Sequence, residues 1–137
     1  NENIDRVRIR GVEFRYQYGM KNLSGDLSAI YQNPEDRATG DQLARRAEKS
    51  LTATINYKAG SYLLGGKLLL VGERPDSSFN TVELDDYAVV DLNLTRNFGK
   101  HIALQARLEN ALDEDYQTAG TFKSQGRAVY LNFLVNN

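Results

Sequence analysis

The chain has 137 residues, with 17 Lys and Arg against 18 Asp and Glu and a formal net charge of −1. This length fits one domain or a piece of a larger one, and the balanced charge gives no general attraction to nucleic acid. The absence of cysteine excludes disulfides, thiolate metal sites and cysteine nucleophiles. The single histidine, His101, leaves nothing for a multi-histidine zinc site, and we expect neither a metal nor another cofactor.

Apolar and polar residues alternate through seven segments, which is the period of a β-strand with two different faces. Such strands, tilted at about 45°, have the length that a bilayer core requires. The apolar residues occupy odd positions before Gly11 and even positions after it, and this change of phase predicts a bulge at the glycine. The predicted strands span residues 7–18, 23–31, 50–57, 62–70, 90–95, 102–109 and 129–135.

The connections between these segments alternate in length. Residues 19–22, 58–61 and 96–100 form tight turns, each with a glycine for an unusual backbone angle. Residues 32–48, 72–86 and 110–126 form long polar loops, and only 41–48 has a pattern that fits a short helical turn. Short turns at one end and long loops at the other are typical of outer-membrane barrels. Tyr18, Tyr57 and Tyr62 flank the tight turns and Tyr31 adjoins a long loop, where headgroup girdles are expected.

These patterns predict an all-β fold, an antiparallel up-and-down meander of about seven strands. The alternation alone leaves two interpretations open. The apolar face either turns outward to lipid, or turns inward in a soluble lipocalin-like barrel that binds a small apolar ligand. Bacterial membrane barrels have an even number of strands, at least eight, so under the first interpretation the chain is an arc of a larger barrel.

Three stretches resemble the C-terminal part of TonB-dependent outer-membrane receptors. The most specific is an Asn-x-x-Asp-x-x-Tyr element that precedes a Gly-Arg pair and a final alternating strand. Residues 45–57 and 72–87 are most similar to the branch that takes up cobalamin. The residues that match the family's pattern are Gly11, Glu13, Tyr87, Asp91, Asn110, Asp113, Tyr116, Gly126 and Arg127.

The resemblance implies that residues 1–137 are the C-terminal segment of a 22-stranded transmembrane β-barrel in the bacterial outer membrane. The family's plug domain is absent from this segment. The resemblance also implies TonB-energised import of cobalamin or a ferric siderophore, and not an enzyme. The implied partners are outer-membrane lipid, the rest of the barrel and the plug, TonB through the N-terminal part, and the nutrient, with no nucleic acid.

Candidate binding residues are few. Arg74 and Phe79 lie in a long loop, where a ligand is expected to meet a barrel. For Arg107 and Glu109, a contact with ligand or plug competes with cross-strand pairing to charges such as Asp91, and we favour the pairing.

The final long loop carries further polar candidates. We expect Asn110 and Asp113 to turn it through hydrogen bonds from side chain to backbone. The nearby acidic residues have the oxygens that calcium prefers, but they lack an EF-hand spacing, and we favour a solvated loop. No catalytic constellation occurs in the sequence.

Overall fold

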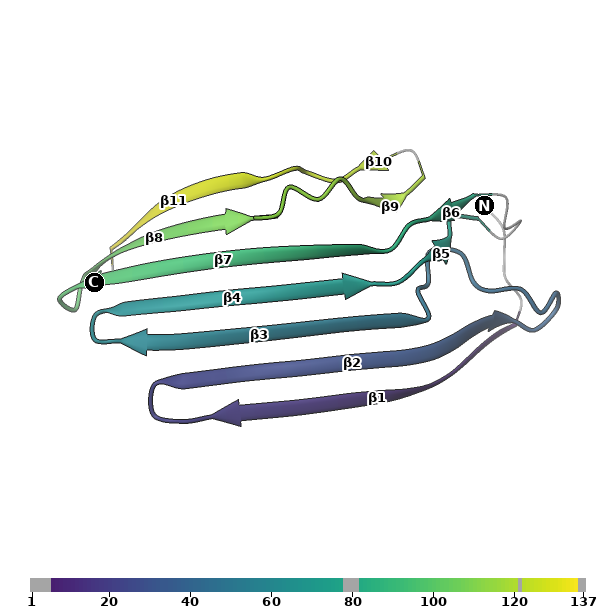
Figure 1. Cartoon of the computed structure of the whole chain (residues 1–137), viewed down its shortest axis with the longest axis horizontal. Coiled ribbons are helices and arrows are strands. Elements are labelled where there is room, and N and C mark those ends of the chain that lie inside the picture. The colour runs from purple at the N-terminus through teal and green to yellow at the C-terminus, as the bar shows by residue number, and fades with distance from the viewer. Residues whose placement is uncertain (1–5, 78–81, 121, 136–137) are drawn as a thin grey trace.

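The computed structural model describes residues 6–77, 82–120 and 122–135. Its main feature is a seven-stranded antiparallel sheet in the order β1-β2-β3-β4-β7-β8-β11 (Figure 1). This arrangement confirms the predicted meander. The strands are β1 (Val7–Gly19), β2 (Leu23–Asp36), β3 (Lys49–Ala59), β4 (Tyr62–Val71), β7 (Tyr87–Phe98), β8 (Ile102–Glu109) and β11 (Ala128–Val135).

The long loops gather at one end of the sheet and contain two short ribbons (Figure 1). In the first ribbon, β5 (Arg74–Pro75) pairs with β6 (Glu83–Leu84), and in the second, β9 (Gln117–Ala119) pairs with β10 (Phe122–Lys123). Among the described residues, no helix is long and apolar enough to cross a membrane.

The predicted helical turn at 41–48 is wrong. The backbone N–H of Leu43 donates to the carbonyl of Pro34 at 2.8 Å, and Gln42 forms a bridge with Glu35. These backbone groups therefore pair with the end of β2 instead of forming a helical turn.

The tight turns lie at the opposite end. Gly60 and Gly99 have positive φ angles of 59° and 69°, so these turns use the freedom that glycine provides. Gly19 has no positive φ angle and simply ends β1, contrary to the prediction for the first turn. β7 is longer than predicted and ends at Phe98, which places Arg96 on the strand instead of in the turn.

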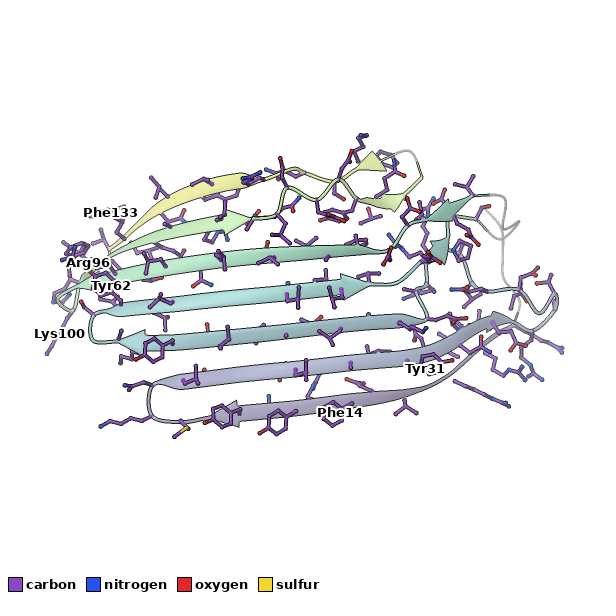
Figure 2. The ribbon with its side chains drawn as sticks, in the orientation of Figure 1. Phe14, Tyr31, Tyr62, Arg96, Lys100 and Phe133 are labelled. Atoms are coloured by element: carbon purple, nitrogen blue, oxygen red, sulfur yellow. The ribbon has the colours of Figure 1, made fainter. Side chains whose placement is uncertain are left out.

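The apolar residues form one continuous face across the sheet. The pairings place Phe14, Ala29, Leu51, Leu70 and Ala88 in a single row across five strands. Figure 2 shows such side chains on neighbouring strands, among them Phe14 on β1 and Tyr31 on β2. Because no described segment covers this face, its large side chains are exposed. The girdle tyrosines Tyr18, Tyr31, Tyr57 and Tyr62 belong to the same exposed set.

The opposite face is polar. One row across it contains Gln17, Asp26, Thr54, Lys67 and Asp91, so the charges near the middle of these strands lie on this side. A sheet that is apolar on one side and polar on the other is the arrangement of a barrel wall between lipid and a wet interior.

The soluble-carrier interpretation predicts a sealed interior lined by Ile55, Leu92 and Leu104. These side chains are instead 55%, 46% and 43% exposed. Within the described part of the chain, β1 and β11 each pair with only one neighbour, so the sheet does not close into a barrel of its own. The apolar face is therefore the outward face of an arc, which contradicts the soluble alternative.

The predicted bulge at Gly11 is also wrong. The pairing of β1 with β2 runs without interruption from Val7 opposite Asp36 to Gly19 opposite Ser24. A Cβ on Gly11 would lie 2.5 Å from the carbonyl oxygen of Tyr31, so this glycine permits a close approach of the two strands. Val7 and Ile9 lie on the polar side because the apolar band has already ended there.

Candidate functional site

The three long loops are joined to one another by polar contacts at the rim. Asp76 lies at the junction. Its carboxylate accepts a hydrogen bond from Arg45 Nε at 2.9 Å and another from the backbone N–H of Gly120. The backbone N–H of Arg45 also donates to the carbonyl of Pro75 at 2.7 Å. One carboxylate thus connects loop 37–48, loop 72–86 and loop 110–127.

The Gly120 bond, followed by the bond from Arg45, holds the pKa of the Asp76 carboxyl below its usual value of 3.8. Because the pKa of Asp76 is lower in the folded protein than in the unfolded chain, its carboxylate stabilises the folded rim fully when the pH is above the unfolded pKa. This stabilisation is lost as the pH falls through the folded pKa. We therefore expect the loops to stay joined at about pH 5 to 7 and to separate in stronger acid.

Spin labels test this expectation, because the chain has no cysteine and new cysteines at Ala38 and Thr118 are labelled selectively. The distance distribution between the labels should be narrow at pH 7 and broaden as the pH falls below 3.8 and through the lowered pKa of Asp76. Asp76→Asn should broaden it at pH 7 already. Glu73→Gln, an exposed change in the same loop, is the control. A wild-type distribution unchanged in acid would contradict the prediction.

Arg74 is the buried centre of the same rim, with only 5% of its surface exposed. Its guanidinium donates to the carbonyls of Gly72 at 3.3 Å and Asp85 at 3.2 Å, and to the carbonyl of Gln117 across the loops. It also lies over the ring of Tyr87, 5.1 Å from the centroid. Arg74 was predicted to bind ligand, but in this structure its donors contact the protein itself.

Tyr87 and Tyr116 stack on each other with their ring centroids 4.4 Å apart. Tyr87 begins β7, whereas Tyr116 precedes β9 in the last loop. The stack therefore fixes that loop over the strand, an arrangement in which aromatic pairs gain energy beyond burial. Two residues singled out by the family pattern are thus direct partners.

Asn110 forms the corner where β8 ends, and it is buried with a left-handed φ of 49°. Its backbone N–H donates to Asp91 Oδ1 at 3.0 Å. Its side chain donates to the carbonyls of Glu114 and Gln125 and accepts from the N–H of Glu114. These are the side-chain-to-backbone hydrogen bonds expected at this position.

Asp113 closes the other side of the corner. Its carboxylate accepts a hydrogen bond from the backbone N–H of Arg127 at 2.9 Å and pairs with the Arg127 guanidinium at 3.2 Å. The backbone bond first, and then the side-chain bond, lower the pKa of the Asp113 carboxyl. Gly126 fits closely beside it, since a Cβ there would lie 3.2 Å from Asp113 Oδ1.

A recess of about 290 Å³ lies between this corner and the polar face of the sheet. Lys67 and Asp91 form part of its wall on the sheet side, and Asn110, Tyr116 and Gln125 on the loop side. It is the place where the polar face meets the last long loop, and its mixture of donors and acceptors suits a polar group of a ligand or of another part of the barrel.

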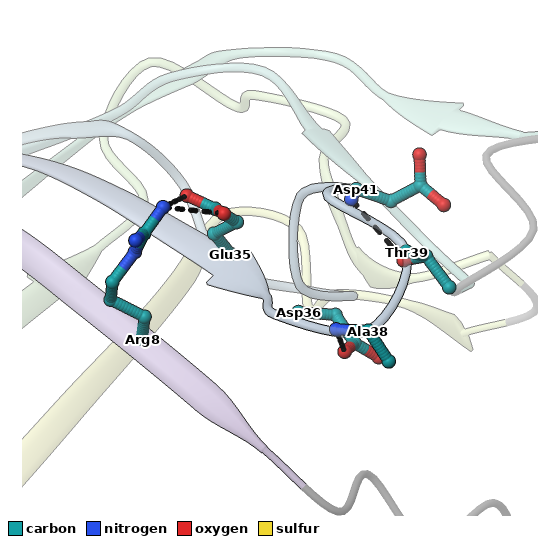
Figure 3. Close-up of polar contacts among 6 residues, drawn as sticks. All are labelled: Arg8, Glu35, Asp36, Ala38, Thr39 and Asp41. Atoms are coloured by element: carbon teal, nitrogen blue, oxygen red, sulfur yellow. Dashed lines mark hydrogen bonds and ion pairs between the residues drawn. The ribbon is translucent and has the colours of Figure 1, made fainter.

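Loop 37–48 is held close to the strands at the same end (Figure 3). Arg8 on β1 pairs with both carboxylate oxygens of Glu35 on β2 at 2.6 Å. Asp36 accepts from the N–H of Ala38 at 2.8 Å, and the Thr39 hydroxyl accepts from the N–H of Asp41 at 3.2 Å. Short side-chain-to-backbone bonds of this kind fix the turn.

The remaining predicted residues lie apart from the rim cluster. Gly11 and Glu13 are on β1 at one edge of the sheet, where Glu13 pairs with Arg15 at 3.5 Å. Phe79 lies outside the described residues. Arg107 pairs with Glu109 on its own strand at 2.9 Å, and not with Asp91. Within the described part of the chain, no group of three or more His, Cys, Asp or Glu side chains is placed to hold a metal ion.

Sequence reasoning missed Arg45 and Asp76, which connect the loops. Their contact joins positions 31 residues apart, and no local pattern marks it. An acidic residue after Arg-Pro in a long loop was the only available signal.

A sheet with a lipid-facing side, a wet side and long loops at one rim defines a wall of a membrane barrel. The sequence model of the family described as TonB dependent receptor-like, beta-barrel, matches residues 1–111. The chain therefore belongs to this family of bacterial outer-membrane proteins, and the matches support its place in the C-terminal part of such a barrel.

Curated relatives include vitamin B12 transporters named BtuB. The protein of Vibrio cholerae is 31% identical over 136 residues, which cover 94% of this chain and 22% of the relative. That of Photobacterium profundum is 28% identical over 128 residues, with 93% and 21% covered. The chain thus spans about a fifth of the length of the curated relatives that it matches.

Solved receptor structures share the fold. The ferric citrate transporter FecA superimposes with a TM-score of 0.84 at 19% identity and covers 94% of this chain and 24% of its own. The siderophore receptor PiuA of Acinetobacter baumannii gives 0.84 at 17% identity, covering 93% and 21%. At these identities the likeness shows the fold alone.

Proposed function

We propose that residues 1–137 form the C-terminal seven strands of a 22-stranded receptor barrel that imports a scarce nutrient across the outer membrane. The main support for this proposal is the sheet with one apolar and one polar face. In the proposed barrel the apolar band faces outward, and the polar face and the joined loops surround a wet passage. In this placement the short turns face the periplasm and the long loops face the exterior.

The proposed nutrient is cobalamin. The curated relatives named as transporters of vitamin B12, which is a cobalamin, are 28–31% identical over nearly the whole chain. Residues 45–57 and 72–87 resemble the same branch of the family. A ferric siderophore is the second candidate, supported by the wider family. The joined loops and the recess beside Asn110 lie where a captured ligand would enter the barrel.

The proposed partners follow from the same placement. The outward face contacts outer-membrane lipid, and the free edges of β1 and β11 pair with the rest of the barrel, since unpaired backbone groups in lipid cost several kcal/mol each. The plug fills the wet interior, and TonB acts through the N-terminal part. None of these roles involves catalysis.

A transport assay tests the proposal. The complete receptor that contains this segment is produced in a cell that depends on external cobalamin and lacks its own receptor. Binding and uptake of labelled cobalamin should both appear, and uptake alone should require TonB. Uptake of a ferric siderophore without cobalamin would overturn the substrate, and failure with both would overturn the function.

A further inference from the structure

The three tight turns and the residues beside them, all within the described part of the chain, carry no negatively charged side chain. Lys21, Lys58, Arg96 and Lys100 lie in or beside these turns, and residues 18–23, 57–63 and 96–102 contain no Asp or Glu. Among the described residues, none of these four side chains forms an ion pair with a carboxylate. This rim therefore offers positive charge without a counter-charge from the described protein.

Arg96 differs from the lysines because it lies on the apolar face. It follows Leu92 and Leu94 on the same side of β7, and its partners across the sheet are Tyr62 on β4 and Leu104 on β8. Phe133 on β11 continues the row opposite Leu104. Figure 2 shows Tyr62, Arg96 and Phe133 at this end of the sheet, with Lys100 in the turn beyond.

Two aromatic rings hold the guanidinium of Arg96. Its central carbon lies 5.4 Å from the ring centroid of Tyr62 and 4.6 Å from that of Phe98. Cation–π contacts of this kind use the faces of the guanidinium. Its N–H edges form no ion pair with the described residues, and these edges match the geometry of a phosphate.

The depth of the site selects the ligand. Aromatic side chains at the end of an apolar band mark the headgroup level of a bilayer, and a long cationic side chain there extends toward the phosphates. Because the rim has four cations and no carboxylate in these segments, its charge favours a lipid with net negative charge.

We propose that Arg96, held by Tyr62 and Phe98, binds the phosphate of an anionic phospholipid in the leaflet at the short-turn rim, with Lys100 as a second contact. The proposal rests on the proposed placement of the chain as a wall of an outer-membrane barrel. It adds a lipid site on the outward face, which is separate from the nutrient passage.

Native mass spectrometry tests the proposal on the complete receptor in detergent, titrated separately with phosphatidylglycerol and with phosphatidylcholine. The wild type should prefer phosphatidylglycerol. Arg96→Gln should weaken that binding about five- to tenfold, because the charge-assisted N–H bonds to the phosphate are lost. Lys100→Gln should weaken it about twofold, as for the loss of an exposed ion pair. Arg15→Gln, which removes a positive charge from the polar face of β1, is the matched control and should leave it unchanged.

Equal binding of the two lipids by the wild type, or wild-type affinity in Arg96→Gln, would overturn the proposal. Preference of this rim for an acidic peptide over the lipid would overturn it too. If Arg96→Gln fails to form a folded barrel, Phe98→Leu keeps the charge but removes one ring, and unchanged lipid affinity in that variant would count against the site. Cobalamin binding by the same receptor, measured in parallel, separates this result from the proposed function.

Discussion

Replacement of Arg74 by methionine is expected to lower the free energy of unfolding of the rim by about 3 kcal/mol. The guanidinium is buried and donates to the carbonyls of Gly72, Asp85 and Gln117. Methionine fills similar space but leaves these acceptors without their donor, and it removes the contact with Tyr87. Loops 72–86 and 110–127 should therefore come apart before the strands unfold.

Limited proteolysis of the folded receptor measures this effect, together with the thermal midpoint in detergent. Cleavage in loops 72–86 and 110–127 should accelerate, and nutrient affinity should fall if the rim binds it. Arg45→Gln is the matched control, because its side chain is 57% exposed and its ion pair is expected to contribute no more than about 1 kcal/mol. Equal effects of the two substitutions would contradict the assigned role of Arg74.

Asn110→Ala is expected to destabilise the corner after β8 by about 3–4 kcal/mol. The side chain makes three hydrogen bonds to backbone groups of Glu114 and Gln125, and its removal leaves those groups unpaired. Alanine also disfavours the left-handed backbone at this position, where φ is 49°. Thermal unfolding and proteolysis of loop 110–127 measure the loss.

Asn110→Gly separates the two contributions. Glycine accepts the positive φ without strain but lacks the side chain, so its cost should be about 1 kcal/mol smaller than that of alanine. A glycine variant as stable as the wild type would mean that only the backbone angle matters. A glycine variant no better than alanine would mean that the hydrogen bonds carry the whole effect.

The strands were predictable from the sequence because period-two alternation is local and their turns are short. The register of β1 could not be predicted from the sequence, because two different physical causes can change the apolar phase at Gly11. One is a bulge, and the other is the end of the apolar band in a strand that continues beyond the bilayer. The uninterrupted pairing of β1 with β2 establishes the second. Arg96 was missed because residues 96–100 were predicted to form a tight turn, whereas β7 continues to Phe98.

The family pattern located most of the rim cluster, although it gave no contacts. Tyr87 with Tyr116, and Asp113 with Arg127, are partners that only the folded chain brings together. The role of Arg74 needed the structure, because the same charge in a loop serves either a ligand or its own backbone. The pairing of Asp76 with Arg45 was not predicted, since it depends on how two separate loops lie.

The contacts of Asp76 with Arg45 and Gly120 have a mechanical consequence. Three hairpin connections that differ in sequence and length are tied in series, so none of them swings outward without pulling on its neighbours. A molecule that binds to one of these loops therefore also restrains the other two. The described parts of the three loops are then restrained together, by the Asp76 carboxylate and by the bonds from Arg74 to Gln117 and from the Arg45 backbone to Pro75.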